Sequence, residues 1–115
     1  MSAECLFCRI RDGKIPSTRL YEDDDVIAFA DVNPQAPSHV LVIPRRHIAT
    51  LNDLVASDDP LTGKIVRVAT QVAAERGLAE RGYRLVANCM EEAGQSVFHL
   101  HVHVLGGRRM SWPPG

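Results

Sequence analysis

Apolar and histidine residues alternate strictly over nine positions near the end of the chain, in the segment 97–105. A period of two is that of a β-strand, whose successive side chains point to opposite faces of a sheet. The pattern predicts a strand with His99, His101 and His103 in a row on one face. The opposite face is predicted to turn toward the core and carries Phe98, Leu100, Val102 and Val104.

Four further strands are predicted by apolar, β-branched runs bounded by turn residues, at 20–22, 26–30, 39–44 and 83–88. A long helix is predicted to begin with Asp59 as N-cap and Pro60 at its first position, and to end at Gly77. Its apolar stripe consists of Leu61, Ile65, Val68, Ala69 and Val72. Residues 50–55 are predicted to form a short helix, and the proline-containing segment 31–38 a loop. Together these elements predict an α+β fold, a five-stranded antiparallel sheet with one long helix across a face.

Length and composition fit a single domain. The chain has 115 residues, 45% of them hydrophobic and 23% charged, which argues against disorder. Its 13 basic and 14 acidic side chains give a net charge of −1, so no global field attracts nucleic acid or an anionic membrane. No apolar run approaches the ~20 residues that span a bilayer, and the first residues lack the pattern of a signal peptide. We therefore expect a cytoplasmic protein, and its three cysteines suggest no disulfide framework.

The histidine row is the strongest chemical feature of the sequence. Alternate strand residues lie ~6.7 Å apart, which places His99 and His103 ~13 Å apart and makes a single metal shared by all three unfavourable. Histidine attacks, donates and accepts protons near neutral pH, so the row can supply a nucleophile and a proton donor beside a phosphate. The turn Ala93-Gly94-Gln95-Ser96 before the row allows close approach of its backbone to a phosphate. A row of solvated histidines and a catalytic zinc centre remain alternatives that the histidines alone do not separate.

The segment 99–105 resembles the HxHxHxx signature of the histidine-triad superfamily of nucleotide hydrolases and transferases. The resemblance covers nearly the whole chain, and the terminal Trp-Pro-Pro-Gly is similar to that of the phosphoramidase branch. The other segments that carry it are 6–10, 31–37, 39–44, 93–98 and 106–111.

The resemblance implies a hydrolase of purine nucleoside 5′-phosphoramidates. His101 would attack the α-phosphorus and form a covalent nucleotidyl-histidine, from which water releases the nucleoside monophosphate. His103 would neutralise the phosphate and protonate the leaving amine, and His39 would support the charge in the site. The carbonyl of His99 would hold the Nδ1–H of His101, which leaves Nε2 free to attack. A dinucleoside polyphosphate hydrolase, a nucleotidyl transferase and a nucleotide-binding scaffold with incidental hydrolysis are the alternatives.

The resemblance also implies the nucleotide contacts. Asp31 would accept from the ribose hydroxyls, although without the resemblance an Asx-turn before Asn33 and Pro34 is the first explanation of this residue. The phosphate would meet Asn88, Gln95, Ser96 and the backbone of Val97. The base would lie in an apolar slot, for which simple core packing is the alternative. That slot consists of Phe7, Ile10, Ile15, Phe29 and Leu41.

Cys5 and Cys8 have the spacing of zinc ligands. In members of the family with this CxxC pair, the resemblance implies that the remaining ligands match His47 and His99. We therefore expect a structural zinc, with two free thiols as the alternative, and no cofactor for catalysis.

The resemblance favours a two-fold homodimer through the long helix and the strand 83–88, in which two sheets merge into one. The tail 106–115 would reach the partner's active site, so Trp112 is expected to contribute to nucleotide binding there; a disordered tail is the alternative. Ser111 stands where related proteins tend to carry histidine, which bears on leaving-group preference. The adjacent Arg108 and Arg109 are expected to be solvated.

Overall fold

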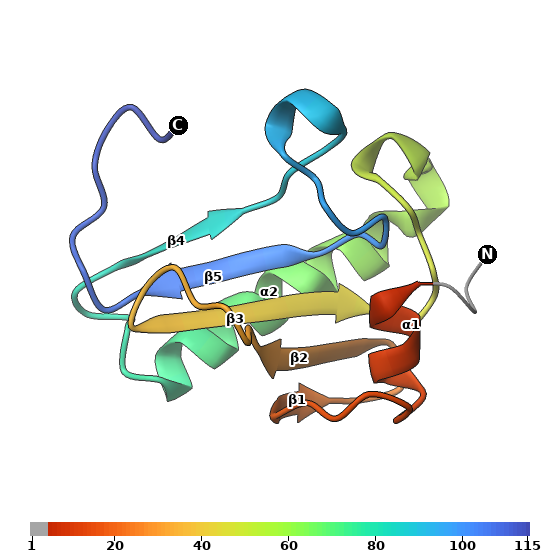
Figure 1. Ribbon diagram of the computed structural model, residues 1–115, viewed down its shortest axis with the longest axis horizontal. Coiled ribbons are helices and arrows are strands. Elements are labelled where there is room, and N and C mark those ends of the chain that lie inside the picture. Colours follow the sequence, from red (N-terminus) through yellow and green to blue (C-terminus); the bar gives the residue numbers. More distant parts are fainter. Residues whose placement is uncertain (1–4) are drawn as a thin grey trace.

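A five-stranded antiparallel sheet forms the centre of the molecule, with strand order β1-β2-β3-β5-β4 (Figure 1). The computed structural model describes residues 5–115. The strands are β1 (Arg19–Glu22), β2 (Val26–Ala30), β3 (Ser38–Pro44), β4 (Tyr83–Val86) and β5 (Val102–Gly106). The predicted α+β fold with five antiparallel strands is confirmed.

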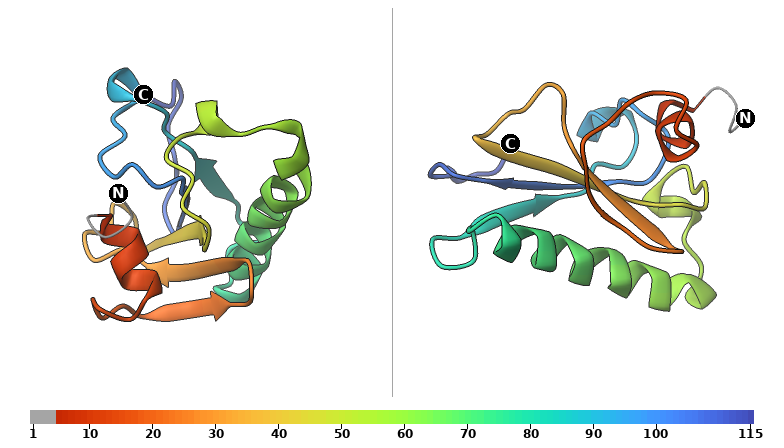
Figure 2. Two further views of the ribbon diagram at one scale, coloured as in Figure 1. Left: turned by 90° about the vertical axis from the view of Figure 1, so that its right-hand side faces the viewer. Right: turned by 90° about the horizontal axis from the view of Figure 1, so that it is seen from below.

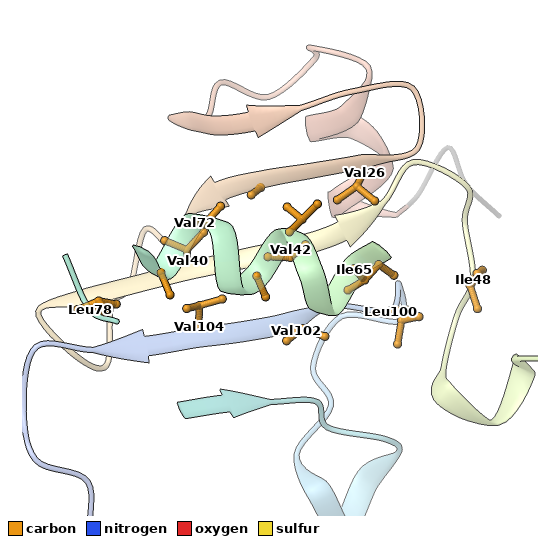
Figure 3. Close-up of a cluster of buried hydrophobic side chains, with 14 residues drawn as sticks. Val26, Val40, Val42, Ile48, Ile65, Val72, Leu78, Leu100, Val102 and Val104 are labelled. Atoms are coloured by element: carbon orange, nitrogen blue, oxygen red, sulfur yellow. The ribbon is translucent and has the colours of Figure 1, made fainter. Parts of the chain in front are cut away.

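The long helix α2 (Asp59–Glu75) crosses one face of this sheet (Figure 2). It begins one residue earlier than predicted, because Asp58 takes the N-cap position, and Gly77 follows its end with φ +77°. Ile65, Val68 and Val72 of α2 pack against Val40, Val42 and Val104 of the sheet in the larger apolar core (Figure 3). Leu61 is only partly buried at the margin of this core.

The opposite face of the sheet carries a short helix that the sequence pattern did not reveal, α1 (Leu6–Arg11). Figure 2 shows α1 and α2 on opposite sides of the sheet. A six-residue helix has too few turns for a recognisable apolar period. Its N-cap is Cys5, whose sulfur accepts a hydrogen bond from the backbone N–H of Cys8. Because both faces of β2 and β3 are covered, these strands are buried almost throughout.

Two strand boundaries differ from the prediction by two or more residues, whereas β1 and β3 each begin one residue earlier than predicted. The fifth strand begins at Val102 and not at 97, because the N–H of Leu100 bonds the carbonyl of Ile48 at 2.6 Å and draws the preceding turn off the strand line. Phe98 is therefore half-exposed and not directed at the core, whereas Leu100, Val102 and Val104 are buried there as expected. The fourth strand ends at Val86, two residues before Asn88.

The predicted short helix at 50–55 is also different. The chain there makes two short 3-10 turns, Leu51–Asp53 and Ala56–Asp58. Thr50 caps the first of them, and its backbone N–H bonds the carboxylate of Asp53. None of the helices in the described part of the chain is both long and apolar enough to traverse a bilayer.

Candidate active site and metal-ligand cluster

The three histidines of the row diverge in the folded chain. His103 alone lies in β5, whereas His99 and His101 belong to the turn that leads into it. The His99 ring is fully buried, His101 is 6% exposed and His103 is half-buried. The three rings therefore lie in three different environments, because each ring meets different partners.

His101 is held in one tautomer. Its Nδ1 lies 2.7 Å from the carbonyl oxygen of His99, and because a carbonyl only accepts, Nδ1 carries the hydrogen. The other nitrogen, Nε2, then keeps a lone pair. Burial lowers the pKa of His101, although the bond to the His99 carbonyl and the charge of Asp31 act in the opposite direction. Its ring packs edge-on against Phe7, with 5.0 Å between centroids, and against His103 at the same separation.

His39 and His103 form a directly bonded pair, with 2.8 Å between Nε2 of His39 and Nδ1 of His103. The backbone N–H of Gln35 donates to Nδ1 of His39 at 3.0 Å, so neutral His39 carries its hydrogen on Nε2. Nδ1 of His103 therefore accepts, which puts the hydrogen of neutral His103 on Nε2. Burial lowers the pKa of His103 to about 4 and also lowers the pKa of His39, while Asp31 raises both.

Asp31 forms the Asx-turn that the sequence left open as an alternative to ribose binding. Its Oδ1 accepts from the backbone N–H of Asn33 at 2.8 Å, which is an Asx-turn. Its Oδ2 lies 3.4 Å from Nε2 of His39. One carboxylate oxygen thus shapes the loop while the other faces the histidine pair.

The residues expected to line the base slot gather in a second apolar cluster on the histidine face of the sheet. They are joined by Ile27 and Ile43, and Val97 packs at the margin. Phe7 packs edge-on against Phe29 at 5.5 Å as well as against His101. Phe7 and Phe29 are almost fully buried, so they pack in the core as the alternative predicted, whereas Ile15 at the margin is more open.

The expected phosphate contacts are placed unevenly. Ser96 is exposed on the turn before His99 and lines an open hollow of about 560 Å³, whose other lining residues include Val97, Phe98, Cys5 and His47 but neither His101 nor His103. The Gln95 side chain is buried and bonds only the chain's own backbone. Asn88 is half-buried beyond the end of β4, and within residues 5–115 its side chain makes no hydrogen bond.

The tail lies beside β4. Arg84 of that strand donates to the carbonyl of Ser111 at 2.9 Å, and its guanidinium lies 6.0 Å from the centre of the Trp112 ring. Trp112 is 81% exposed and, within the described residues, contacts no histidine of its own chain. Arg108 is not merely solvated, because its guanidinium donates to the carbonyl of Gln35.

Cys5, Cys8, His47 and His99 converge as the CxxC spacing and the resemblance led us to expect. Each offers one ligand atom, and these atoms lie within 4.8 Å of one another. The nitrogens of His47 and His99 are 3.2 Å apart, and three sulfur–nitrogen separations measure 3.3, 3.3 and 3.5 Å. Tetrahedral zinc with Zn–N of ~2.05 Å and Zn–S of ~2.3 Å separates its ligand atoms by about 3.3–3.8 Å. The geometry of the cluster therefore fits such an ion.

The protonation of His99 agrees with a ligand role. Its Nε2 lies 2.8 Å from the carbonyl oxygen of Pro44, so that nitrogen carries the hydrogen and Nδ1 directs a lone pair at the two sulfurs. Burial lowers the pKa of His99 to about 4, which keeps the ring neutral. Burial and the neighbouring Cys5 raise the pKa of the Cys8 thiol to about 11. A bound cation would favour the thiolate and so lower this pKa.

The family model for the HIT domain matches residues 12–110 of the chain. The chain belongs to the HIT family. It is 45% identical over 108 residues to the purine nucleoside phosphoramidase of Escherichia coli K12, a match that covers 94% of this chain and 91% of that protein. An uncharacterized HIT-like protein of Synechocystis is 47% identical over 115 residues, which is 100% of both chains.

Solved structures give the same picture. The crystal structure of a HIT family hydrolase from Legionella pneumophila superposes with a TM-score of 0.95 at 51% identity, covering 97% of this chain and 100% of that one. A HIT family hydrolase from Clostridium thermocellum gives a TM-score of 0.92 at 49% identity, covering 94% of both.

Sequence reasoning missed two positions of this HIT-family site, Gln35 and Pro44. Both act through the backbone, Gln35 by donating to His39 and Pro44 by accepting from His99. A main-chain group leaves no signature in side-chain pattern, so only the fold reveals such roles.

Proposed function

We propose that this HIT-family chain hydrolyses the phosphorus–nitrogen bond of purine nucleoside 5′-phosphoramidates through a nucleotidyl intermediate on His101. The observation that carries the proposal is the bond from Nδ1 of His101 to the carbonyl of His99, because it leaves Nε2 with the lone pair that a nucleophile needs. The 45% identity to a protein named purine nucleoside phosphoramidase supports the choice of substrate class.

The reaction proceeds in two balanced steps. Nε2 of His101 forms a bond to phosphorus, and the phosphorus–nitrogen bond of the substrate breaks with its electron pair going to nitrogen. That nitrogen takes up a proton from Nε2 of His103, which has first taken a proton from solvent, because the negatively charged phosphate favours the imidazolium form of the ring. A water oxygen then bonds phosphorus, the bond to His101 breaks, and the water's proton returns to solvent through His103. The nearby imidazoles and N–H groups stabilise the charge on phosphorus during both steps.

The nucleotide is bound by three sets of groups. The base lies against the margin of the apolar cluster around Phe7, Ile10 and Phe29. The ribose hydroxyls donate to the carboxylate of Asp31, which is partly exposed beside His39. The phosphate meets Ser96 and the backbone of Val97, with Asn88 on the β4 side.

Replacement of His101 tests the nucleophile. His101→Ala should lower kcat by at least about a thousandfold while AMP still binds, because the base and ribose contacts lie elsewhere. The wild-type protein quenched during turnover should carry a nucleotide on His101 by peptide mass spectrometry, and His47→Ala protein should carry it on the same residue. Substantial turnover by His101→Ala protein, or a label on another residue, contradicts the mechanism. Faster turnover of dinucleoside polyphosphates than of phosphoramidates would instead assign the alternative substrate class.

We propose, further, that Cys5, Cys8, His47 and His99 hold a structural zinc and that the chemistry uses no metal. The tautomer of His99 and the ligand separations support this assignment. The metal-binding atom of His99 would be Nδ1, whereas the nucleophile is Nε2 of His101. The ion would therefore hold α1 to the turn before β5 and take no part in the bonds that form and break.

We propose that two chains associate through the open edge of β4 and the outer face of α2. In the described part of the chain β4 pairs only with β5, so one edge remains available for a second sheet. Val66 on α2 and Trp112 in the tail are large apolar residues that are exposed to solvent. In such a homodimer the tail of one chain reaches the active site of its partner.

A further inference from the structure

Gln95 holds the connection between β4 and β5 in place through its hydrogen bonds. The connection reverses direction at Met90, which has a φ of +71° and is the only non-glycine residue with positive φ among residues 5–115. This conformation is unfavourable for a residue with a side chain and needs support from its surroundings. Gln95 provides it twice, because its backbone N–H donates to the carbonyl of Met90 at 3.1 Å and its Oε1 accepts from the N–H of Met90 at 2.9 Å.

The nitrogen of the same amide bonds two other backbone segments. Nε2 of Gln95 donates to the carbonyl of Ala49 at 2.9 Å and to that of Val97 at 3.1 Å. Because an N–H faces one end of the amide and two carbonyls face the other, only one amide orientation satisfies all three partners. The side chain is 7% exposed and has no hydrogen left for a ligand.

What Gln95 holds is the turn that presents Ser96 and Val97. The N–H groups of Ser96 and Val97 make no hydrogen bond within residues 5–115, and Ser96 is exposed. The turn is fastened on its far side as well, since the N–H of Leu100 bonds the carbonyl of Ile48. The available N–H groups thus lie on a turn fastened at both ends directly before His101. Successive N–H groups and a hydroxyl on a fixed turn suit an anion such as a phosphate.

We propose that Gln95 is a positioning residue for the phosphate of the nucleotide. It fixes the direction of the Ser96 and Val97 N–H groups without touching the nucleotide, which replaces the direct contact expected from the sequence. The inference rests on the proposed function, because it takes the phosphate to lie at this turn. Its consequence is selective: loss of Gln95 weakens the recognition of the phosphate and leaves the recognition of the nucleoside intact.

The test compares AMP with adenosine. Gln95→Met keeps the length and the neutrality of the side chain but removes all three of its hydrogen bonds. By calorimetry, the Kd of AMP should rise about tenfold and that of adenosine by less than about twofold. With phosphoramidate substrate, KM should rise because the turn holds the phosphate in the ground state, and kcat should fall because the turn holds the charge that develops in the transition state more strongly. Gln71→Met on α2, on the other face of the sheet, is the matched control and should change neither affinity.

Equal weakening of AMP and adenosine by Gln95→Met, or no weakening of either, overturns the proposal. If the variant does not fold, NMR of the wild-type protein decides: AMP should shift the Ser96 and Val97 N–H signals more than adenosine does, while the Gln95 side-chain NH2 exchanges slowly with and without ligand. Rapid exchange of that NH2 in the free protein overturns the positioning role alone. A wild-type protein that binds AMP no better than adenosine overturns the proposed phosphate site itself, and Gln95 with it.

Discussion

At the scale of single residues, a backbone group beside one ring nitrogen decides where the hydrogen of His101, His39 and His99 lies. The His99 carbonyl fixes the hydrogen of His101, the Gln35 N–H fixes that of His39, and the Pro44 carbonyl fixes that of His99. In three rings of one residue type, three backbone groups therefore decide which nitrogen carries the hydrogen and which keeps a lone pair. The row of histidines in the sequence predicted histidine chemistry, but only the fold shows the backbone groups that decide which nitrogen of these rings carries the hydrogen.

The substitution Asp31→Asn separates the effect of the Asp31 charge from the effect of its hydrogen bond within the loop. Asp31→Asn keeps an oxygen to accept from Asn33, so the Asx-turn persists, but it removes the negative charge that raises the pKa of His39 and His103. We expect the pKa of His39 to fall in an NMR titration and kcat/KM to drop about tenfold. A weaker grip on the ribose hydroxyls should raise KM in the same variant.

Asp53→Asn serves as the control for Asp31→Asn, because Asp53 also bonds a nearby backbone N–H but lies in the 3-10 turn after β3. Its effect should be confined to thermal stability. An Asp31→Asn protein with an unchanged His39 titration would show that the carboxylate does not act on the histidine pair.

At the scale of elements, the sequence predicted those parts of the fold that have a long apolar period. The core strands β2 and β3 and the helix α2 were found because burial imposes their pattern directly. The start of β5 was not, since alternation continues through 97–101 although the Leu100 N–H bonds Ile48 and leaves the sheet. The helix α1 was missed because six residues carry no measurable period. The helix begins at the Cys5-x-x-Cys8 pair, where Cys5 is the N-cap. The sequence pattern identified this pair by its zinc-ligand spacing and gave no sign that it caps a helix.

The metal-ligand cluster joins α1, the segment after β3 and the turn before β5. The double variant Cys5→Ala/Cys8→Ala should lose the zinc found in untagged wild-type protein and lower Tm by about 10 °C, because an ion that binds only the folded chain stabilises it. Metal analysis and thermal unfolding measure both effects, and cobalt substitution should give the absorption of a tetrahedral thiolate site in the wild type.

Cys89→Ala supplies the control for the metal site, since Cys89 is the one remaining cysteine and lies outside the cluster. It should keep both the zinc and the Tm of the wild type. A double variant that retains the same zinc content would refute the ligand assignment.

The turn between β1 and β2 is predicted to make the free energy of unfolding depend on pH in the acid range. Although burial opposes it, hydrogen bonds from Lys64, Tyr21 and the N–H groups of Asp25 and Val26 hold the pKa of Asp23 well below its usual range. A carboxyl whose pKa is lower in the folded chain stabilises the fold above the unfolded pKa, and this contribution is lost as the pH falls from about 4. Asp23→Asn should therefore lower Tm at pH 7 by about 5 °C and show a smaller further loss in acid. Asp24→Asn, at a neighbouring position without these bonds, should keep the acid dependence of the wild type.

At the scale of the whole molecule, the two faces of the sheet carry different groups. One face packs against α2 and forms the larger core, while the other carries the histidines, the smaller apolar cluster and the proposed metal ligands. The tail leaves the end of β5 and lies along the outer edge at β4, where Arg84 holds Ser111 and faces Trp112. The most exposed aromatic side chain of the described residues thus lies at the edge where a second sheet is proposed to join.

A mixture of two variants decides whether the tail acts on its own chain or on its partner. Removal of residues 110–115 should leave the dimer and AMP binding intact and change the relative kcat/KM of phosphoramidates with bulky and small amines, because Trp112 no longer shapes the leaving-group side. His101→Ala chains keep the tail but have no nucleophile. In a hybrid dimer of the two, the only working site belongs to the truncated chain, and the only tail belongs to its partner. If the tail reaches across the two-fold axis, hybrids formed by refolding an equal mixture should recover the wild-type preference between the two amines, measured after separating hybrids from parents by a charge tag. A hybrid that keeps the preference of the truncated protein would place the tail on its own chain's site, and a wild-type protein with the mass of a single chain by light scattering would remove the dimer altogether.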